Sequence, residues 1–162
     1  MFGIDIIGPL PETKKKNRFI LSIVDHFSKF AFAFAIKNHK AKTIAKILIE
    51  EVFCIFGLPE KILTDQGTEF CSKLVQQFFK MLQIEHTTSV AYNPQTNELI
   101  ERFNGTLQEL LKKYCSQNRT DWDIELPYVL AAYRRTTHSA IKMSPFIALF
   151  GTQFSSPVDT LI

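Results

Sequence analysis

Alternation of apolar and polar positions predicts three strands near the start of the chain. Residues 3–7 and 19–24 are short apolar runs, and the first of them is closed by Gly-Pro-Leu-Pro, which breaks a strand. Residues 30–36 alternate strictly, with phenylalanine or isoleucine on one face and alanine on the other. Because the connections are short, we expect an antiparallel meander. The small alanine face should let a helix approach the sheet closely.

Beyond residue 40 the apolar spacing becomes that of amphipathic helices, interrupted by two more short strands. The predicted helices cover residues 41–56, 70–82, 98–114, 122–135 and 144–151. The predicted strands cover residues 61–64 and 84–88. Asn97 is the expected N-cap of the long helix, and Pro127 is placed in the first turn of the helix after it. Phe70, Leu74, Phe78 and Leu82 are expected to form the apolar stripe of the second helix.

This order of elements describes an α/β fold in which a five-stranded mixed sheet carries helices on both faces. The chain has 162 residues and shows no internal repeat or linker, so we expect one domain over residues 1–162. The longest apolar run has seven residues, against the roughly 20 that a membrane helix needs, so no membrane span is expected. Three cysteines without a CxxC pair suit a reducing compartment and argue against a structural zinc site.

Net charge alone says little about partners, because it is only +3. The one dense run of positive charge is Lys14–Lys16 with Arg18, and four more lysines follow at Lys37, Lys40, Lys42 and Lys46. Such a run could contact phosphates, but a solvated turn between two strands explains it at least as well. The composition therefore permits nucleic-acid binding without requiring it.

Three acidic residues occupy positions where chemistry could occur. Asp5 lies in the middle of an apolar strand, Asp65 follows the fourth strand, and Glu101 falls in the first turn of the long helix. Each alone has an ordinary explanation: an ion pair for Asp5, a turn for Asp65, and a favourable helix dipole for Glu101. Together they could converge as hard oxygen ligands for Mg²⁺ or Mn²⁺, and a pair of such metals would promote attack on a phosphodiester.

Four segments resemble the catalytic core of retroviral and gypsy-type retrotransposon integrases. Residues 3–11 (GIDIIGPLP) with 23–30 (IVDHFSKF) resemble its opening, residues 62–70 (ILTDQGTEF) its second motif, and residues 92–104 (YNPQTNELIERFN) its third. The tail, AYRRTTHS followed by SPF, is also similar. Asp65 and Glu101 are separated by 35 residues, which is the spacing of that family.

The resemblance implies a ribonuclease-H-like fold with Asp5, Asp65 and Glu101 around a two-metal Mg²⁺ or Mn²⁺ site. The implied reaction is 3′-end processing and strand transfer of element DNA into target DNA. The implied setting is a homodimer formed through the core, with an intracellular, nuclear location. The positions that match or could reach DNA are Tyr92, Gln95, Asn97, Arg102 and Lys112.

Two departures from the family leave alternatives open. Glu98 stands where the family usually has glycine, and neither the upstream zinc module nor the downstream module of integrases is expected in this sequence. One alternative is a domesticated or degenerate core that serves as a non-catalytic DNA-binding or protein-interaction module. Another is a ribonuclease that acts on RNA–DNA hybrids, against which the integrase-type third motif argues.

Glu98→Gly should raise strand transfer, because Glu98 and Glu101 lie three residues apart on a helix and place two negative charges close together. Glycine would also restore the conformational freedom of the preceding loop. A strand-transfer assay that compares the variant with the parent chain tests this prediction. Equal or lower activity of the variant would contradict it.

Overall fold

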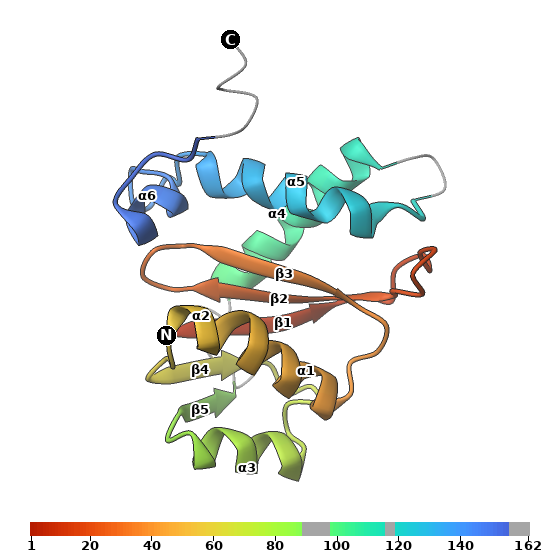
Figure 1. Cartoon of the computed structure of the whole chain (residues 1–162), viewed down its shortest axis with the longest axis vertical. Helices are drawn as coiled ribbons and strands as arrows, with labels where there is room; N and C mark the ends of the chain where they lie inside the picture. Colours follow the sequence, from red (N-terminus) through yellow and green to blue (C-terminus); the bar gives the residue numbers. More distant parts are fainter. Residues whose placement is uncertain (89–97, 116–118, 156–162) are drawn as a thin grey trace.

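The computed structural model describes residues 1–88, 98–115 and 119–155, and one mixed sheet crosses its centre (Figure 1). Its strands are β1 (Phe2–Ile7), β2 (Phe19–Asp25), β3 (Ala31–Ile36), β4 (Lys61–Thr64) and β5 (Glu85–Thr88). They lie in the order β3-β2-β1-β4-β5, in which β1, β2 and β3 are antiparallel neighbours while β4 is parallel to β1 and β5 to β4. The predicted meander and the mixed five-stranded sheet are both confirmed.

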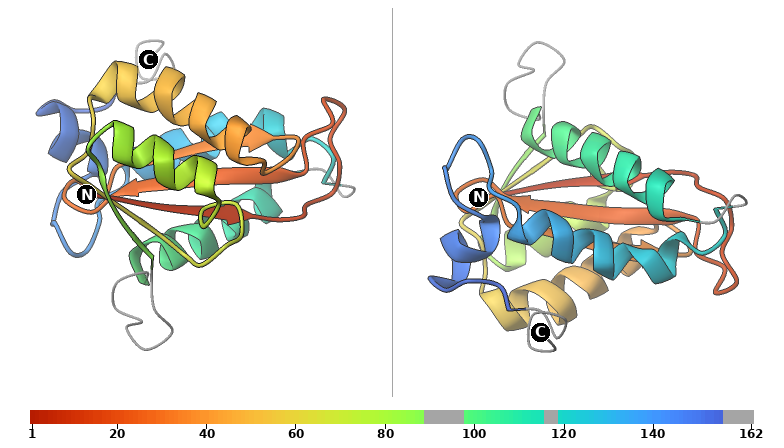
Figure 2. Two further views of the ribbon diagram at one scale, coloured as in Figure 1. Left: turned by 90° about the horizontal axis from the view of Figure 1, so that it is seen from below. Right: turned by 90° about the horizontal axis from the view of Figure 1, so that it is seen from above.

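Helices cover both faces of the sheet (Figure 2). They are α1 (Ala41–Ile47), the π-helical segment η1 (Leu48–Phe53), α2 (Cys54–Phe56), α3 (Lys73–Met81), α4 (Glu98–Tyr114), α5 (Trp122–Arg135) and α6 (Pro145–Phe150). The run from α1 to α2 and helix α3 pack on one face, and α4 and α5 on the other. Among the described residues, no helix is long and apolar enough to cross a membrane.

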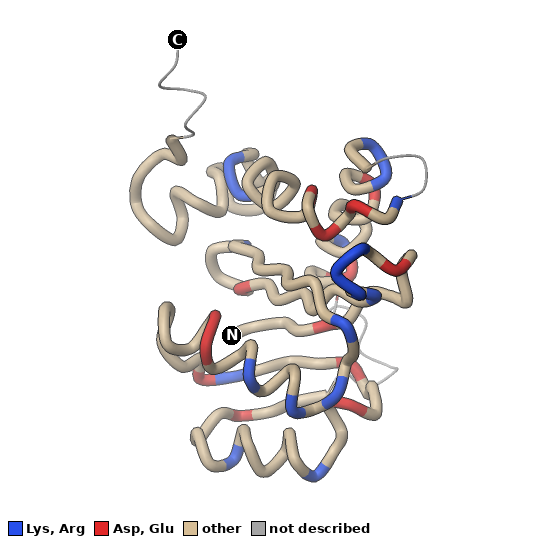
Figure 3. Tube along the Cα trace, turned by 45° about the vertical axis from the view of Figure 1, so that its right-hand side comes forward, with Lys and Arg blue, Asp and Glu red and all other residues tan. Residues whose placement is uncertain are grey.

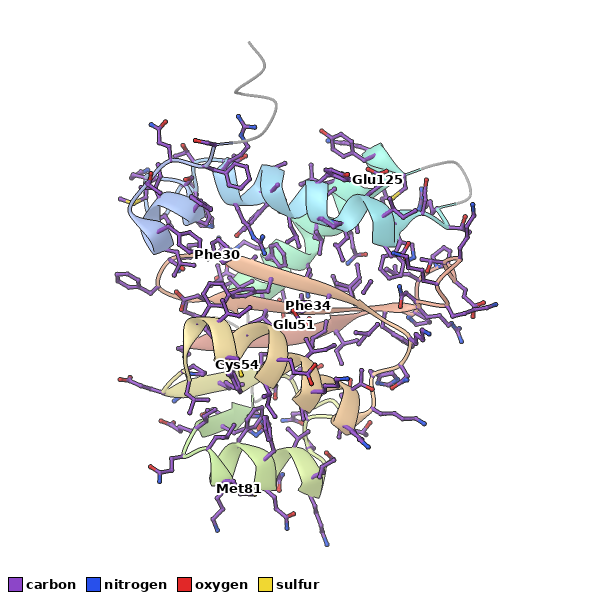
Figure 4. The ribbon with its side chains drawn as sticks, viewed as in Figure 1. Phe30, Phe34, Glu51, Cys54, Met81 and Glu125 are labelled. Carbon is purple, nitrogen blue, oxygen red and sulfur yellow. The ribbon has the colours of Figure 1, made fainter. Side chains whose placement is uncertain are left out.

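Strand β3 shows how the alternating sequence builds the two layers. Ala31 and Ala33 are buried against α4 and α5, and their small side chains let α5 approach the strand. Phe30, just before the strand, and Phe34 lie on the opposite side, facing the helical run from α1 to α2 (Figure 4). The ring of Phe30 lies 6.3 Å from that of Phe56 in α2. The strict alternation therefore assigns one face of β3 to each helical layer, as predicted.

The second predicted helix begins later than its apolar spacing suggested. Helix α3 starts at Lys73, because the hydroxyl of Ser72 accepts a hydrogen bond from the Val75 N–H and caps the helix. Leu74 is exposed, whereas Val75 and Phe79 are buried against the sheet. Of the predicted stripe, Phe70 is buried just before the helix and Phe78 and Leu82 pack partly buried against the core. The four-residue repeat thus predicted the element and three of its core contacts, but it placed Leu74 wrongly and missed Val75 and Phe79.

Pro127 lies in the interior of α5 as its sixth residue, not in the first turn as predicted. A proline there lacks the N–H that would bond the carbonyl four residues earlier, which normally weakens a helix. The helix nevertheless begins at Trp122, whose side chain is buried and donates a hydrogen bond to the Pro11 carbonyl (2.8 Å). Packing of this indole fixes the start of α5 ahead of the position that the proline favours.

The loop between β1 and β2, residues 8–18, is fastened to the start of α5 by buried polar contacts. The Asp123 carboxylate accepts hydrogen bonds from the Thr13 hydroxyl (2.9 Å) and the Asn17 amide (2.8 Å). Thr13 is only 2% exposed and Asn17 is 9% exposed. The indole of Trp122 adds its bond to Pro11 on the same loop. This loop is therefore held by side chains and not by its own turn alone.

Asp123→Ala should lower the free energy of unfolding by about 1–3 kcal/mol, because it leaves the buried groups of Thr13 and Asn17 without their acceptor. Urea denaturation followed by circular dichroism measures the change. Glu125→Ala is the matched control, since it removes an acidic residue from the same first turn of α5. Equal losses in both variants would show that the loop contacts contribute nothing beyond the helix-dipole effect.

Candidate active site

Asp5 and Asp65 lie side by side on neighbouring parallel strands. Ile4 of β1 is paired with Thr64 of β4, so the residues that follow them are adjacent across the sheet. Side chains at adjacent positions of a parallel pair point to the same face. Asp5 faces α4, because its carboxylate accepts a hydrogen bond from the Asn104 amide of that helix (2.7 Å).

Helix α4 brings the third predicted carboxylate to the same face. Asn104 is buried at 6% exposure, and Glu101 lies three residues earlier on the helix, one turn closer to its start. Gly3 of β1 lies under α4, and a Cβ there would make ordinary contact with the Cβ of Ile100 at 3.6 Å. The same Cβ would lie only 3.2 Å from Nε2 of His26, so a larger residue at this position would crowd that ring.

Asp5 is harder to ionise than an ordinary aspartate, and two other acids lie near it. Burial raises the pKa of Asp5 to about 6, and the charges of Asp65 and Glu101 also raise it. Hydrogen bonds to the carboxylate from the Ile6 N–H (2.7 Å) and from Asn104 act in the opposite direction. The fold therefore keeps a carboxylate in a place where ionisation is costly, close to two further acids.

These acids are not arranged as a ready-made metal cluster. Among the residues that the structure describes, no group of three or more histidine, cysteine, aspartate or glutamate side chains is placed so that it could hold a metal ion. Asp5 is engaged by Ile6 and Asn104, and the Asp65 carboxylate accepts a hydrogen bond from the Gly67 N–H (2.9 Å). The carboxylate oxygens are nevertheless the donor type that Mg²⁺ and Mn²⁺ prefer.

A buried hydrogen-bonded chain supports the backbone at Asp65. The hydroxyl of Thr64, which is fully buried, donates to the Asp65 carbonyl (2.9 Å) and lies 2.9 Å from Nε2 of His86 in β5. Because that hydroxyl has a single proton, Nε2 of His86 is the donor to Thr64. Burial lowers the pKa of His86, so the neutral ring is favoured. Sequence reasoning missed both His86 and Asn104, although the position of Asn104 three residues after Glu101 was a usable signal.

The predicted DNA-contacting residues fall into three groups. Tyr92, Gln95 and Asn97 lie outside the described residues. Arg102 is exposed near the start of α4 and forms an ion pair with Glu98, with 3.6 Å between Nη2 and Oε1. Lys112 is exposed near the opposite end of the helix.

The pairing of Glu98 with Arg102 bears on the departure from the family noted in the sequence. Both side chains are mostly exposed, so the pair contributes little to stability. It does offset the negative charge of Glu98 one turn away from Glu101. The repulsion expected between Glu98 and Glu101 is therefore reduced in this arrangement.

Comparison with known proteins identifies the family. A family model described as integrase core domain matches residues 3–94. The Pol polyprotein of transposon 412 from Drosophila melanogaster is 32% identical over 154 residues, an alignment that covers 95% of this chain and 12% of that protein. The Pol polyprotein of Radiation murine leukemia virus (strain Kaplan) is 38% identical over 136 residues, covering 83% of this chain and 23% of that protein. The chain thus spans a small part of these relatives.

Solved structures agree with the fold. The simian T-cell lymphotropic virus intasome in complex with PP2A regulatory subunit B56 gamma contains a chain with a TM-score of 0.78 and 26% identity, covering 96% of this chain and 55% of that one. The trimeric form of the HTLV-2 integrase catalytic core domain in complex with magnesium gives a TM-score of 0.72 at 22% identity, covering 91% of this chain and 94% of that one. With a family model that matches more than half of its length, the chain belongs to the integrase core domain family of retroviruses and retrotransposons.

Proposed function

We propose that this chain is the catalytic core of an integrase, a divalent-metal-dependent polynucleotidyl transferase that processes the 3′ ends of element DNA and joins them to target DNA. The observation that carries the proposal is the placement of Asp5 beside Asp65 with Glu101 on the helix packed over them. Membership of the integrase core family and the magnesium complex of a structural relative support it.

In this proposal Asp5, Asp65 and Glu101 hold Mg²⁺ or Mn²⁺ at a two-metal site. The bound cations would activate the attacking water or 3′-hydroxyl and stabilise the leaving oxygen of the phosphodiester. Asn104 and the Ile6 N–H orient the Asp5 carboxylate, while Gly67, Thr64 and His86 fix the position of Asp65. The attacking oxygen forms a bond to phosphorus, and the opposite bridging P–O bond breaks.

The proposed partners are the element ends and the target DNA, which place the protein inside the cell, in the nucleus. Tyr92, Gln95, Asn97, Arg102 and Lys112 are proposed to contact DNA. Of the two described residues, Arg102 is next to Glu101 in the sequence and Lys112 lies farther along α4. A homodimer through the core is also proposed. A partly exposed aromatic face beside the edge strand β3 supports the homodimer. Its rings include Phe56 and Phe150, whose centroids are 6.4 Å apart and which are 37% and 47% exposed.

Mg²⁺ or Mn²⁺ should drive strand joining on a branched, disintegration-type DNA substrate, and the activity should vanish in Asp65→Asn and in Glu101→Gln. Each of these substitutions removes one charged ligand while preserving shape. Gel analysis of the joined product over a metal titration is the measurement. Metal binding without joining in any form of the chain would favour the non-catalytic module, and cleavage of an RNA–DNA hybrid alone would favour the ribonuclease.

Asp5→Asn should stabilise the protein in EDTA at pH 7.5 by about 1–2 kcal/mol. Two pKa units correspond to about 3 kcal/mol for a fully buried group, and water reaches part of this carboxyl. The pKa of Asp5 is about 6 in the folded chain and 3.8 ordinarily, so the cost of ionising Asp5 in the folded chain grows as pH rises between these values. The Tm of Asp5→Asn should therefore exceed that of the parent chain most above pH 6, and the difference should vanish below pH 4. Glu109→Gln, on the exposed face of α4, is the control.

The same melting experiment tests metal binding without relying on activity. Added Mg²⁺ should raise the Tm of the parent chain, because it binds the folded carboxylates and offsets their repulsion. It should raise the Tm of Asp5→Asn much less. An equal rise in both proteins would exclude Asp5 from the metal site.

A further inference from the structure

Exposed cations gather where several strands of the sheet begin or end, and all of them except Lys112 are unused by the proposed chemistry (Figure 3). The carboxyl ends of β1 and β3 and the amino end of β2 meet there, and Asp65 follows the carboxyl end of β4 at the same edge. We call this surface the basic edge, and it comprises Lys14, Lys15, Arg18, Lys37, Lys40 and Lys112. All six side chains are exposed.

Contacts make the basic edge continuous with the loop that follows Asp65. The Arg18 N–H donates to the Ile36 carbonyl (3.0 Å), which brings the β1–β2 loop against the end of β3. The rings of Phe19 and His39 are 4.7 Å apart. Nδ1 of His39 lies 3.5 Å from the carboxylate of Glu69. The cations after β3 therefore lie beside the segment that carries the second aspartate.

The other end of the basic edge lies at the last turns of α4. Lys112 lines a small cavity, about 70 Å³, together with Leu10 and Pro11 of the β1–β2 loop. Lys112 lies eleven positions after Glu101 on one helix, which corresponds to about 16 Å along its axis. That length matches about five base-pair steps of duplex DNA at 3.4 Å each.

Acidic residues at this edge are held by contacts within the fold. Glu12 forms an ion pair with Lys16 (2.8 Å), and Asp123 keeps its charge but is held by Thr13 and Asn17 of the β1–β2 loop. Lys14 and Lys15, by contrast, make no hydrogen bond or ion pair with any residue that the structure describes. Two adjacent ammonium groups are thus available to a ligand.

The β1–β2 loop is fixed more firmly than a solvated turn requires. Thr13 and Asn17 are buried against the start of α5, which costs desolvation that their hydrogen bonds to the partly buried Asp123 offset. Their effect is to hold the backbone on both sides of Lys14 and Lys15 in one position. A preorganised pair of cations loses less conformational freedom when it binds a fixed anion than a pair on a loose loop does.

We propose that the basic edge binds the phosphate backbone of duplex DNA, up to about five base pairs from the reacting phosphodiester. This inference rests on the proposed function and names a second contact surface for its DNA. DNA is favoured over an acidic protein because contacts join these cations to the segment that follows Asp65 and to α4, which carries Glu101. The loop that follows β1 thereby positions the duplex over the acids of β1 and β4.

Lys14→Ala/Lys15→Ala should weaken binding of a 30-base-pair duplex about tenfold or more at low salt. The slope of log K against log salt should shrink by about 1.8, because each lost phosphate contact removes about 0.9. Fluorescence anisotropy with the whole chain in EDTA, which prevents chemistry, measures both quantities. The matched control is Lys80→Ala/Lys142→Ala, which removes the same charge from exposed sites on α3 and in the turn before α6. An unchanged slope in the first variant, or an equal change in the control, would overturn the proposal.

Asp123→Ala separates positioning from net charge. The substitution makes the chain more positive, so simple attraction would tighten DNA binding, whereas release of the β1–β2 loop should weaken it severalfold. The measurement is made at a temperature where circular dichroism shows the variant folded. Tighter or unchanged binding would overturn the role of the fixed loop.

Strand joining reports on the carboxylate site, whereas the salt dependence of DNA binding reports on the basic edge. Strand joining by the parent chain together with an unchanged salt slope in Lys14→Ala/Lys15→Ala would reject only the basic edge. Loss of DNA binding in this variant, with no strand joining by the parent chain, would support the basic edge and reject the catalytic proposal. Binding of a polyglutamate peptide that the two lysine substitutions abolish, with DNA binding intact, would reassign the edge to an acidic protein partner.

Discussion

The packing of α4 on β1 is organised around one ionisable group, the carboxylate of Asp5. This side chain lies in β1, in which Ile4 and Ile7 are buried. Hydrogen-bond donors of the fold itself must therefore stabilise its charge. Asn104 supplies one donor from the helix and Ile6 supplies another from the backbone. Removing the Asn104 amide would leave the carboxylate in the same place without one of its two donors.

That arrangement explains why stability and chemistry compete at this position. Burial already disfavours ionisation of this carboxylate, and the charges of two further acids add to that cost. The Oδ1 atom of Asn104 is likewise buried without a hydrogen-bond partner among the described residues. Polar groups buried in this way are costly to a fold unless they find partners. Their presence together is expected of a site that gains stabilising interactions from a ligand.

Local patterns in the sequence predicted the elements well, because each pattern reports on one strand or helix. The alternation of phenylalanine and alanine in β3 correctly assigned each face of the strand to a helical layer. The positions of Asp5 and Asp65 relative to their strands were also predicted, and with the parallel pairing of β1 and β4 they place the two acids side by side.

The features that sequence reasoning missed depend on contacts between distant segments. Thr13 and Asp123 are 110 residues apart, and no spacing rule connects them. The interior position of Pro127 follows from the anchoring of Trp122 on Pro11, which is again a tertiary contact. The sequence around Lys14–Lys16 fits both a phosphate-binding surface and a solvated turn. The contacts that favour the first are those of Thr13 and Asn17 with Asp123, which the sequence does not reveal.

The parallel pairing of β1 with β4 also has a consequence for how the chain folds. The first three strands are hairpin neighbours and can form early, whereas Gly3 meets Leu63 only after a loop of about 60 residues has closed. Until that event, Asp5 stands alone without the like charges that perturb it. The complete set of acids requires α4 as well, which comes later still in the chain. A partly folded chain therefore lacks the site, and the three acids come together only when both the sheet and α4 are in place.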